Sequence, residues 1–137
     1  LLDTVLNHAN EAFRKQNLAE ARRIEPLEQV VDDMVSLLKD HHLKRLRDGE
    51  CGVFNGSEFF NLLSEAERIS DVCSNIGVAT VARSTPGINH QVHNYISMLH
   101  SGRDEEFNEV YQKAHDEYIS MLQGKEFVLS QKIPQKG

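Results

Sequence analysis

The sequence has little that would interrupt a helix, with three prolines and eight glycines in 137 residues. No apolar run approaches the ~18 residues that a membrane-spanning helix requires, and the chain opens without a signal-peptide pattern. No segment alternates between apolar and polar residues with a period of two, so strands are not expected. These absences predict a globular domain built from long helices, and the length suits one domain with a real core.

A basic surplus is also missing, since the formal net charge is −6. A domain that binds phosphate backbones usually carries an excess of Lys and Arg, so nucleic acid is not expected as a partner. The two cysteines, Cys51 and Cys73, form no disulfide framework, which indicates a reducing compartment. Leu1 opens the chain already in helical register, and we therefore expect a fragment of a longer protein.

Five helical segments emerge from the apolar spacing. Asp104 suits the N-cap of the last one, with two glutamates in its first turn. The glycine-rich stretch 48–57 (DGECGVFNGS) is predicted to be a loop. Residues 1–125 are expected to form the helical domain and residues 126–137 a polar C-terminal tail. The predicted helices cover roughly residues 1–15, Leu18 to Arg47, Ser57 to Arg83, Asn89 to His100, and Asp104 to Gly124.

Two of these segments carry apolar stripes with alternating spacings of three and four residues, which is typical of packed antiparallel helices. Short connections between such helices favour an up-down bundle. The predicted fold class is therefore all-α, an up-down antiparallel helical bundle. The stripe of the second segment is Ile24, Leu27, Val31, Met34 and Leu38, and that of the third is Leu62, Ala66, Ile69, Cys73, Ile76 and Thr80.

An acidic pair with i, i+4 spacing occurs on both of these helices. Glu28 and Asp32 share one face of the second helix, and Glu67 and Asp71 share one face of the third. Like charges at this spacing destabilise a helix by a few tenths of a kcal/mol per pair. If the intervening loop is tight, the two pairs lie at similar heights.

Three environments would compensate these charges, and the spacing alone leaves them open. The first is solvent, and the second is salt bridging to Arg22, Arg23, Arg68 or Arg83. The third is a metal ion with a preference for oxygen ligands, such as Mg²⁺, Mn²⁺, Ca²⁺ or iron. Glu25 and Asn75, each about one turn from a pair, are candidates for an additional ligand or for orienting one.

Patterns of catalytic chemistry are not found. No His stands three residues after a Glu, which argues against ferritin-like di-iron chemistry. No Ser-His-Asp order, phosphate loop or CxxC pair occurs, and an enzyme is not expected. His90 and His93 are expected to be exposed or to cap a helix rather than bind metal. His41 and His42 are expected to face the dipole at the end of the long second helix.

Two of these segments resemble the motifs of a known family. ERISDVCSNI resembles the signature that closes a PhoU repeat, and LEQVVD resembles the matching motif on the preceding helix. Over about residues 1–125 the chain resembles the PhoU-like domain at the C-terminus of bacterial Na⁺/phosphate cotransporter-type membrane proteins. This resemblance implies a PhoU-type bundle, with one three-helix repeat plus extra C-terminal helices.

The resemblance also implies a function and a site. PhoU proteins are cytoplasmic regulators of phosphate uptake, and some bind metal through these motifs. The implied ligands are Glu28, Asp32, Glu67 and Asp71, for an ion such as Fe, Mn, Mg or Zn. The implied partner is a transporter domain of the same chain at the inner membrane.

One departure from the family bears on the oligomeric state. A full PhoU has two repeats and this chain has one pair of motifs, so the domain is either half-length or completes its site as a homodimer. The alternative function is a structural helical interaction or dimerisation domain with no bound metal.

Overall fold

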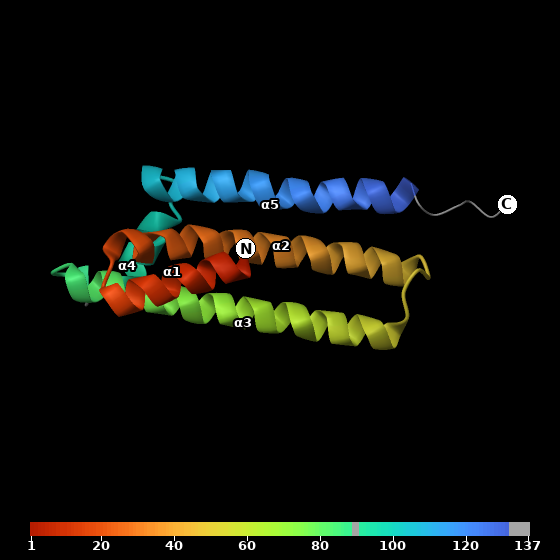
Figure 1. Ribbon diagram of the computed structural model, residues 1–137, viewed down its shortest axis with the longest axis horizontal. Coiled ribbons are helices and arrows are strands. Elements are labelled where there is room, and N and C mark those ends of the chain that lie inside the picture. The colour runs from red at the N-terminus through yellow and green to blue at the C-terminus, as the bar shows by residue number, and fades with distance from the viewer. Residues whose placement is uncertain (89–90, 132–137) are drawn as a thin grey trace.

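Figure 1 shows a computed structural model of the chain, which describes the backbone of residues 1–88 and 91–131 and the side chains up to residue 123. Within this part of the chain there are five helices and no strand, which confirms the all-α prediction. The helices are α1 (Leu2–Lys15), α2 (Leu18–Arg47), α3 (Val53–Ser84), α4 (Val92–Leu99) and α5 (Glu105–Gln131).

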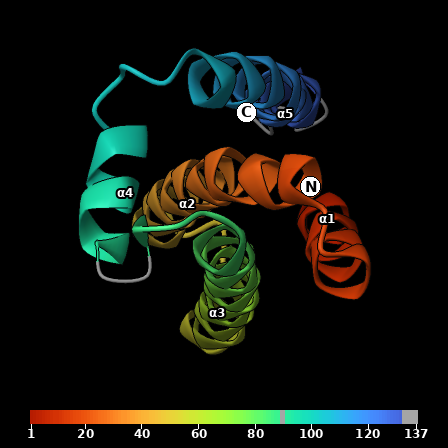
Figure 2. The same ribbon diagram turned by 90° about the vertical axis from the view of Figure 1, so that its left-hand side faces the viewer.

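Helix α2 is the central element of the bundle. Helices α1 and α3 pack against α2 and against each other, and α5 packs mainly on α2 (Figure 2). Helices α1, α2 and α3 alternate in direction, whereas α5 runs in the same direction as α2 because α4 carries the chain across one end of the bundle (Figure 1). This arrangement leaves one long side of the α2–α3 pair free of a third long helix.

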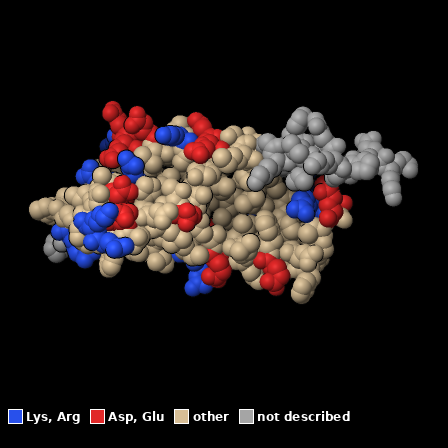
Figure 3. Space-filling view, in the orientation of Figure 1, with Lys and Arg blue, Asp and Glu red and all other residues tan. Residues whose placement is uncertain are grey.

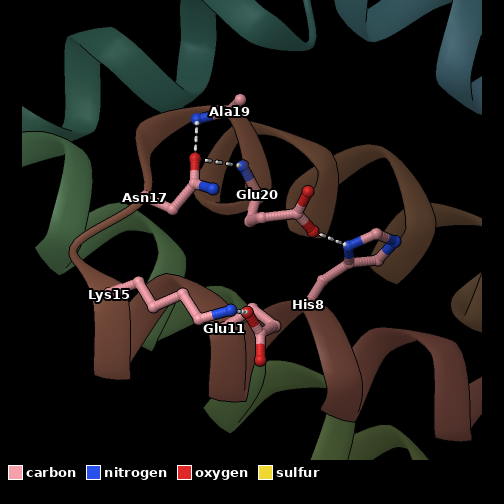
Figure 4. Close-up of polar contacts among 6 residues, drawn as sticks. All are labelled: His8, Glu11, Lys15, Asn17, Ala19 and Glu20. Carbon is pink, nitrogen blue, oxygen red and sulfur yellow. Dashed lines mark hydrogen bonds and ion pairs between the residues drawn. The ribbon is translucent and has the colours of Figure 1, made fainter.

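Side-chain caps begin two of the long helices. The Asn17 side chain accepts hydrogen bonds from the amides of Ala19 and Glu20 at the start of α2 (Figure 4). The predicted cap at Asp104 is confirmed, since its Oδ1 accepts from the Phe107 amide at 2.8 Å. Each cap satisfies amides that have no partner within the helix, and this fixes where the helix begins.

The core lies where α1, α2 and α3 meet. Gly77 allows α3 to approach the backbone of α2, because a Cβ at this position would lie 2.9 Å from the carbonyl oxygen of Ala21. The buried apolar residues of the core cluster are Val5, Ala9, Ala12, Ala21, Ile24, Leu27, Val30, Val31, Val35, Leu63, Cys73, Val81 and Ala114. They confirm the α2 stripe at Ile24, Leu27 and Val31.

Two predicted helix ends are wrong. Helix α3 begins at Val53 rather than near Ser57, so part of the glycine-rich stretch is helical. Gly56 lies within its first turns, packed over the ring of His42, where a side chain would not fit. Helix α5 continues past Gly124 to Gln131. Residues 132–137 lie outside the described part of the chain, and the predicted division at residue 125 stays a prediction.

The predicted α3 stripe is only partly correct. Cys73 and Thr80 are buried, but Leu62 and Ile69 are 65% and 40% exposed. Ile69 instead lines a groove of about 680 Å³ between α1 and α3. This groove, which we call the α1–α3 groove, also exposes Leu6, Phe13 and Val72. The short α1 therefore leaves part of the apolar surface of α3 uncovered.

Charged side chains are dispersed over the surface. On the face shown in Figure 3, acidic and basic groups alternate in small clusters, and much of the middle is uncharged. No continuous basic surface is seen on the described part of this face. None of the described helices is long and apolar enough to cross a membrane.

Candidate metal centre

Three of the predicted acidic residues meet between α2 and α3. Glu28 and Asp32, one turn apart on α2, lie opposite Asp71 on α3. One carboxylate oxygen from each residue lies within 4.8 Å of the others. The i, i+4 spacing puts the two α2 carboxylates on one face, and the close α2–α3 contact brings Asp71 to them. We call these three residues the acidic triad.

The electrostatics of the acidic triad show charges placed together without a counter-charge. Partial burial raises the pKa of Glu28 to about 8, and the neighbouring Asp32 carboxylate adds to the shift. Burial, and then the charge of Asp71, also raises the pKa of Asp32. Within the described chain, no Lys or Arg forms an ion pair with any of the three. A cation among these oxygens would relieve both the repulsion and the desolvation.

The donor set fits a hard cation. Mg²⁺, Mn²⁺ and Ca²⁺ prefer carboxylate oxygens and take six or more ligands, several of them commonly water. The three carboxyl groups supply three negative charges once Glu28 releases its proton, and the exposed Asp71 leaves the triad open to solvent. The residues present would therefore hold such an ion with water completing its coordination.

Glu67, the fourth predicted ligand, has a different partner. The Nζ of Lys39 donates to its Oε2 at 2.9 Å. Salt bridging was one of the predicted compensations, but none of the four suggested arginines provides it. Arg22 pairs with Glu106 and Arg68 with Glu65. Metal ligation by Glu67 stays a prediction that would require release of Lys39.

Glu25 is buried and fully engaged away from the acidic triad. Its Oε2 accepts from the Ser74 hydroxyl, and its Oε1 lies 2.8 Å from Nε2 of His100. This contact joins α2, α3 and the C-terminal end of α4. The predicted role of Glu25 as an additional ligand or as an orienting residue stays a prediction. No local pattern predicts the partner of Glu25, because Glu25 and His100 are 75 residues apart.

The remaining predicted polar candidates are not part of the acidic triad. Asn75 and His93 are exposed on α3 and α4, and His90 lies outside the described residues. The dipole-facing role predicted for His42 is wrong. Its ring is buried, with ring centroids 4.8 Å from Phe59 and 5.4 Å from Phe60.

The two cysteines show no sign of reactivity. Cys51 and Cys73 are free thiols. Cys73 is buried in the core, and burial raises the pKa of its thiol. A raised pKa lowers the thiolate fraction and hence the nucleophilicity. Cys73 is therefore a packing residue.

The N-terminal helices of the chain match the model of a known protein family. The model of the PhoU domain matches residues 1–80, which comprise α1, α2 and nearly all of α3. The chain belongs to the PhoU family. The match includes both acidic motifs and confirms the resemblance to PhoU, whereas the resemblance to cotransporter-type proteins stays a prediction. No curated protein and no solved structure matches the chain.

The PhoU assignment defines the broad class of function. PhoU domains are regulatory helical domains with a phosphate-related role, and PhoU is not a known enzyme family. The matched region ends within α3, so α4 and α5 lie outside the PhoU match. The acidic triad lies wholly within the match, whereas the contact between Glu25 and His100 extends beyond it.

Proposed function

We propose that this chain is a metal-binding regulatory domain that controls phosphate uptake by a sodium-dependent phosphate transporter. The acidic triad carries the metal-binding part of the proposal. Three carboxylates with oxygens within 4.8 Å and no basic partner in the described chain repel one another, and without a cation Glu28 must hold a proton, as its raised pKa indicates. The bound ion, for which Mn²⁺, Mg²⁺, Fe³⁺ or Zn²⁺ are candidates, would supply a positive charge that ties α2 to α3.

The transporter part of the proposal rests on the PhoU family and on the sequence resemblance to cotransporter-type proteins. In this proposal the domain lies at the cytoplasmic face of the inner membrane and contacts the membrane domain of its own chain. Metal occupancy would stabilise one α2–α3 arrangement and so set the surface that the transporter contacts.

Calorimetric titration tests the metal-binding step. Mn²⁺, Fe³⁺ and Zn²⁺ are titrated into the wild type and into a Glu28→Gln, Asp71→Asn double variant. We expect at least one ion to bind the wild type and to lose tenfold or more in affinity in the variant. An Asp40→Asn, Glu58→Gln variant is the matched control, because it removes the same charge from exposed positions on the same two helices. Equal binding by all three proteins would contradict the proposal.

Phosphate uptake by cells tests the regulatory step. The same two double variants are placed in the full-length protein that carries this chain. We expect the triad variant to change the response of uptake to external phosphate, and the control variant to behave as the wild type. An unchanged response in the triad variant would show that the triad does not control phosphate uptake, and would contradict the regulatory part of the proposal.

A protein-interaction domain is the second candidate function, and the α1–α3 groove favours it. Leu6, Phe13, Ile69 and Val72 are 44%, 59%, 40% and 58% exposed along this groove. An apolar groove of this kind is typical of an interaction surface, and homodimerisation is one use of it. Sedimentation of the wild type and of a Phe13→Ser, Val72→Ser variant tests this use. A wild type that remains monomeric at ~0.1 mM, well above the Kd of a stable dimer, would contradict dimerisation through this groove.

A further inference from the structure

A second cavity lies on the opposite side of α2 from the acidic triad. It is open to solvent, has a volume of about 560 Å³ and is lined by residues of α1, α2 and α5. This volume lies within the ~300–1,000 Å³ typical of small-molecule sites, which often form between the helices of bundles. Its lining residues are Thr4, His8, Arg23, Leu27, Glu109, Val110, Lys113, Ala114, Glu117 and Tyr118. The PhoU match supplies the α1 and α2 walls but not the α5 wall.

The lining combines an apolar floor with cations on two walls. Leu27 and Ala114 are buried and form the apolar part with Val110. Arg23 projects from α2, and Lys113 from α5 on the other wall. Neither cation forms a hydrogen bond or an ion pair with any residue in the described part of the chain. Both cations line the same cavity, so a group that enters it can meet charges from two helices.

The neighbouring carboxylates explain why Arg23 is unpaired. Glu20 lies one turn before Arg23 on α2 but points to the ring of His8 and bonds its Nδ1 (Figure 4). Glu106, at the start of α5, lies 3.7 Å from Arg22 instead. Glu20 and Glu106 are thus held by other partners. The two glutamates that line the cavity, Glu109 and Glu117, form no ion pair with Arg23. The guanidinium of Arg23 keeps its donors for a group that enters the cavity.

We propose that this cavity binds a phosphate monoester, with the phosphate between Arg23 and Lys113 and the organic part on the apolar floor. A guanidinium donates two parallel hydrogen bonds to phosphate, and an ammonium adds a point charge. The hydroxyls of Thr4 and Tyr118 are further donors on the same lining. The volume and the apolar floor exceed what inorganic phosphate alone would fill, which favours an ester.

Two acidic residues on α5 limit the affinity of this site. Glu109 and Glu117 flank Lys113 at i−4 and i+4 and line the cavity. Their charges repel a phosphate dianion, so the site suits a ligand that also uses the apolar floor. Glu117→Gln is therefore expected to tighten binding severalfold, in the opposite direction to changes of the cations.

Calorimetry with defined probes tests the proposal. AMP and glycerol 3-phosphate are titrated into the whole chain in the presence of EDTA, which separates this site from any metal site. Inorganic phosphate and adenosine are titrated in parallel. We expect a monoester to bind with submillimolar Kd and each of the other two probes to bind at least tenfold more weakly. Arg23→Gln and Lys113→Gln are each expected to weaken the monoester tenfold or more.

Arg22→Gln is the matched control, because Arg22 neighbours Arg23 but does not line this cavity. It is expected to bind within twofold of the wild type. Circular dichroism verifies that each variant folds, as expected for exposed side chains. Absence of binding by both monoesters, equal affinity of the Arg23→Gln variant, or equal binding of adenosine and AMP would each overturn the proposal. Inorganic phosphate that binds as tightly as the esters would overturn the role of the apolar floor.

Discussion

The Nζ of Lys39 lies 2.9 Å from Oε2 of Glu67, across the α2–α3 interface. This ion pair divides the four predicted ligands into one neutralised carboxylate and three carboxylates without a basic partner in the described chain. The free energy of metal binding at the triad therefore depends on whether Glu67 stays paired with Lys39.

Lys39→Met is expected to release Glu67 toward the acidic triad. The half-exposed pair contributes little stability, about 1 kcal/mol or less. The freed carboxylate adds a negative charge beside the triad, so the affinity for Mn²⁺ should rise threefold to tenfold. Calorimetric titration measures this change, with Lys44→Met as a control at an exposed position of α2. Unchanged affinity would show that Glu67 has no influence on the ion.

Glu28→Gln is expected to stabilise the chain in the absence of metal, most strongly at alkaline pH. Glu28 has a pKa of about 8 in the folded chain and an ordinary value of 4.5. Between pH 4.5 and about pH 8, Glu28 holds its proton in the folded state but has lost it in the unfolded state. The free energy of unfolding therefore falls as pH rises through this range. We expect the variant to gain about 1–2 kcal/mol at pH 8, after a discount for partial exposure.

Urea denaturation with EDTA at pH 5 and pH 8 measures this effect. The gap between variant and wild type should be small at pH 5, where the folded wild type keeps the proton, and large at pH 8. A gap that is equal at both pH values would contradict the raised pKa.

Gly77→Ala is expected to destabilise the chain by about 1–3 kcal/mol, because the added methyl group would overpack the α2–α3 contact. The Cβ would lie 2.9 Å from the Ala21 carbonyl oxygen and 3.0 Å from Cδ1 of Ile24. A backbone oxygen cannot move aside as a flexible side chain does. Gly52→Ala is the control, since its Cβ would meet no atom within 4 Å. Urea midpoints compare the two, and equal midpoints would refute the close approach.

Glu25→Ala is expected to loosen α4. The change leaves the buried Ser74 hydroxyl and the His100 ring without their acceptor, at a cost of about 1–3 kcal/mol. Hydrogen exchange of the α4 amides should become faster in the variant. The control Glu65→Ala removes an exposed carboxylate paired only with Arg68 and should leave α4 exchange unchanged. Equal exchange in both variants would mean that other contacts hold α4.

Much of the fold was predictable because it follows from local signals. The bounds of α2 match the prediction because Asn17 caps its first turn, the apolar spacing of three and four runs to Leu38, and basic residues occupy its last turn. The start of α3 was missed because glycines are usually loop residues, whereas Gly56 is required in the helix by the ring of His42. The sequence alone does not distinguish a glycine that allows close packing inside a helix from a glycine in a loop.

The site was predictable only in part, for a similar reason. The i, i+4 spacing correctly placed Glu28 beside Asp32, but the distance of Asp71 and the Lys39–Glu67 pair depend on how α2 and α3 face each other. Contacts between residues far apart in the chain leave no local pattern. The outward orientation of Ile69 was missed because α1 is too short to cover that face of α3.

The most direct test of the central claim is an anomalous difference map from crystals grown with Mn²⁺. We predict a peak about 2.1–2.3 Å from one oxygen of each triad residue, Glu28, Asp32 and Asp71, with water completing the coordination. A map with no peak at these three carboxylates, or with its peaks only at other acidic groups, would contradict the account.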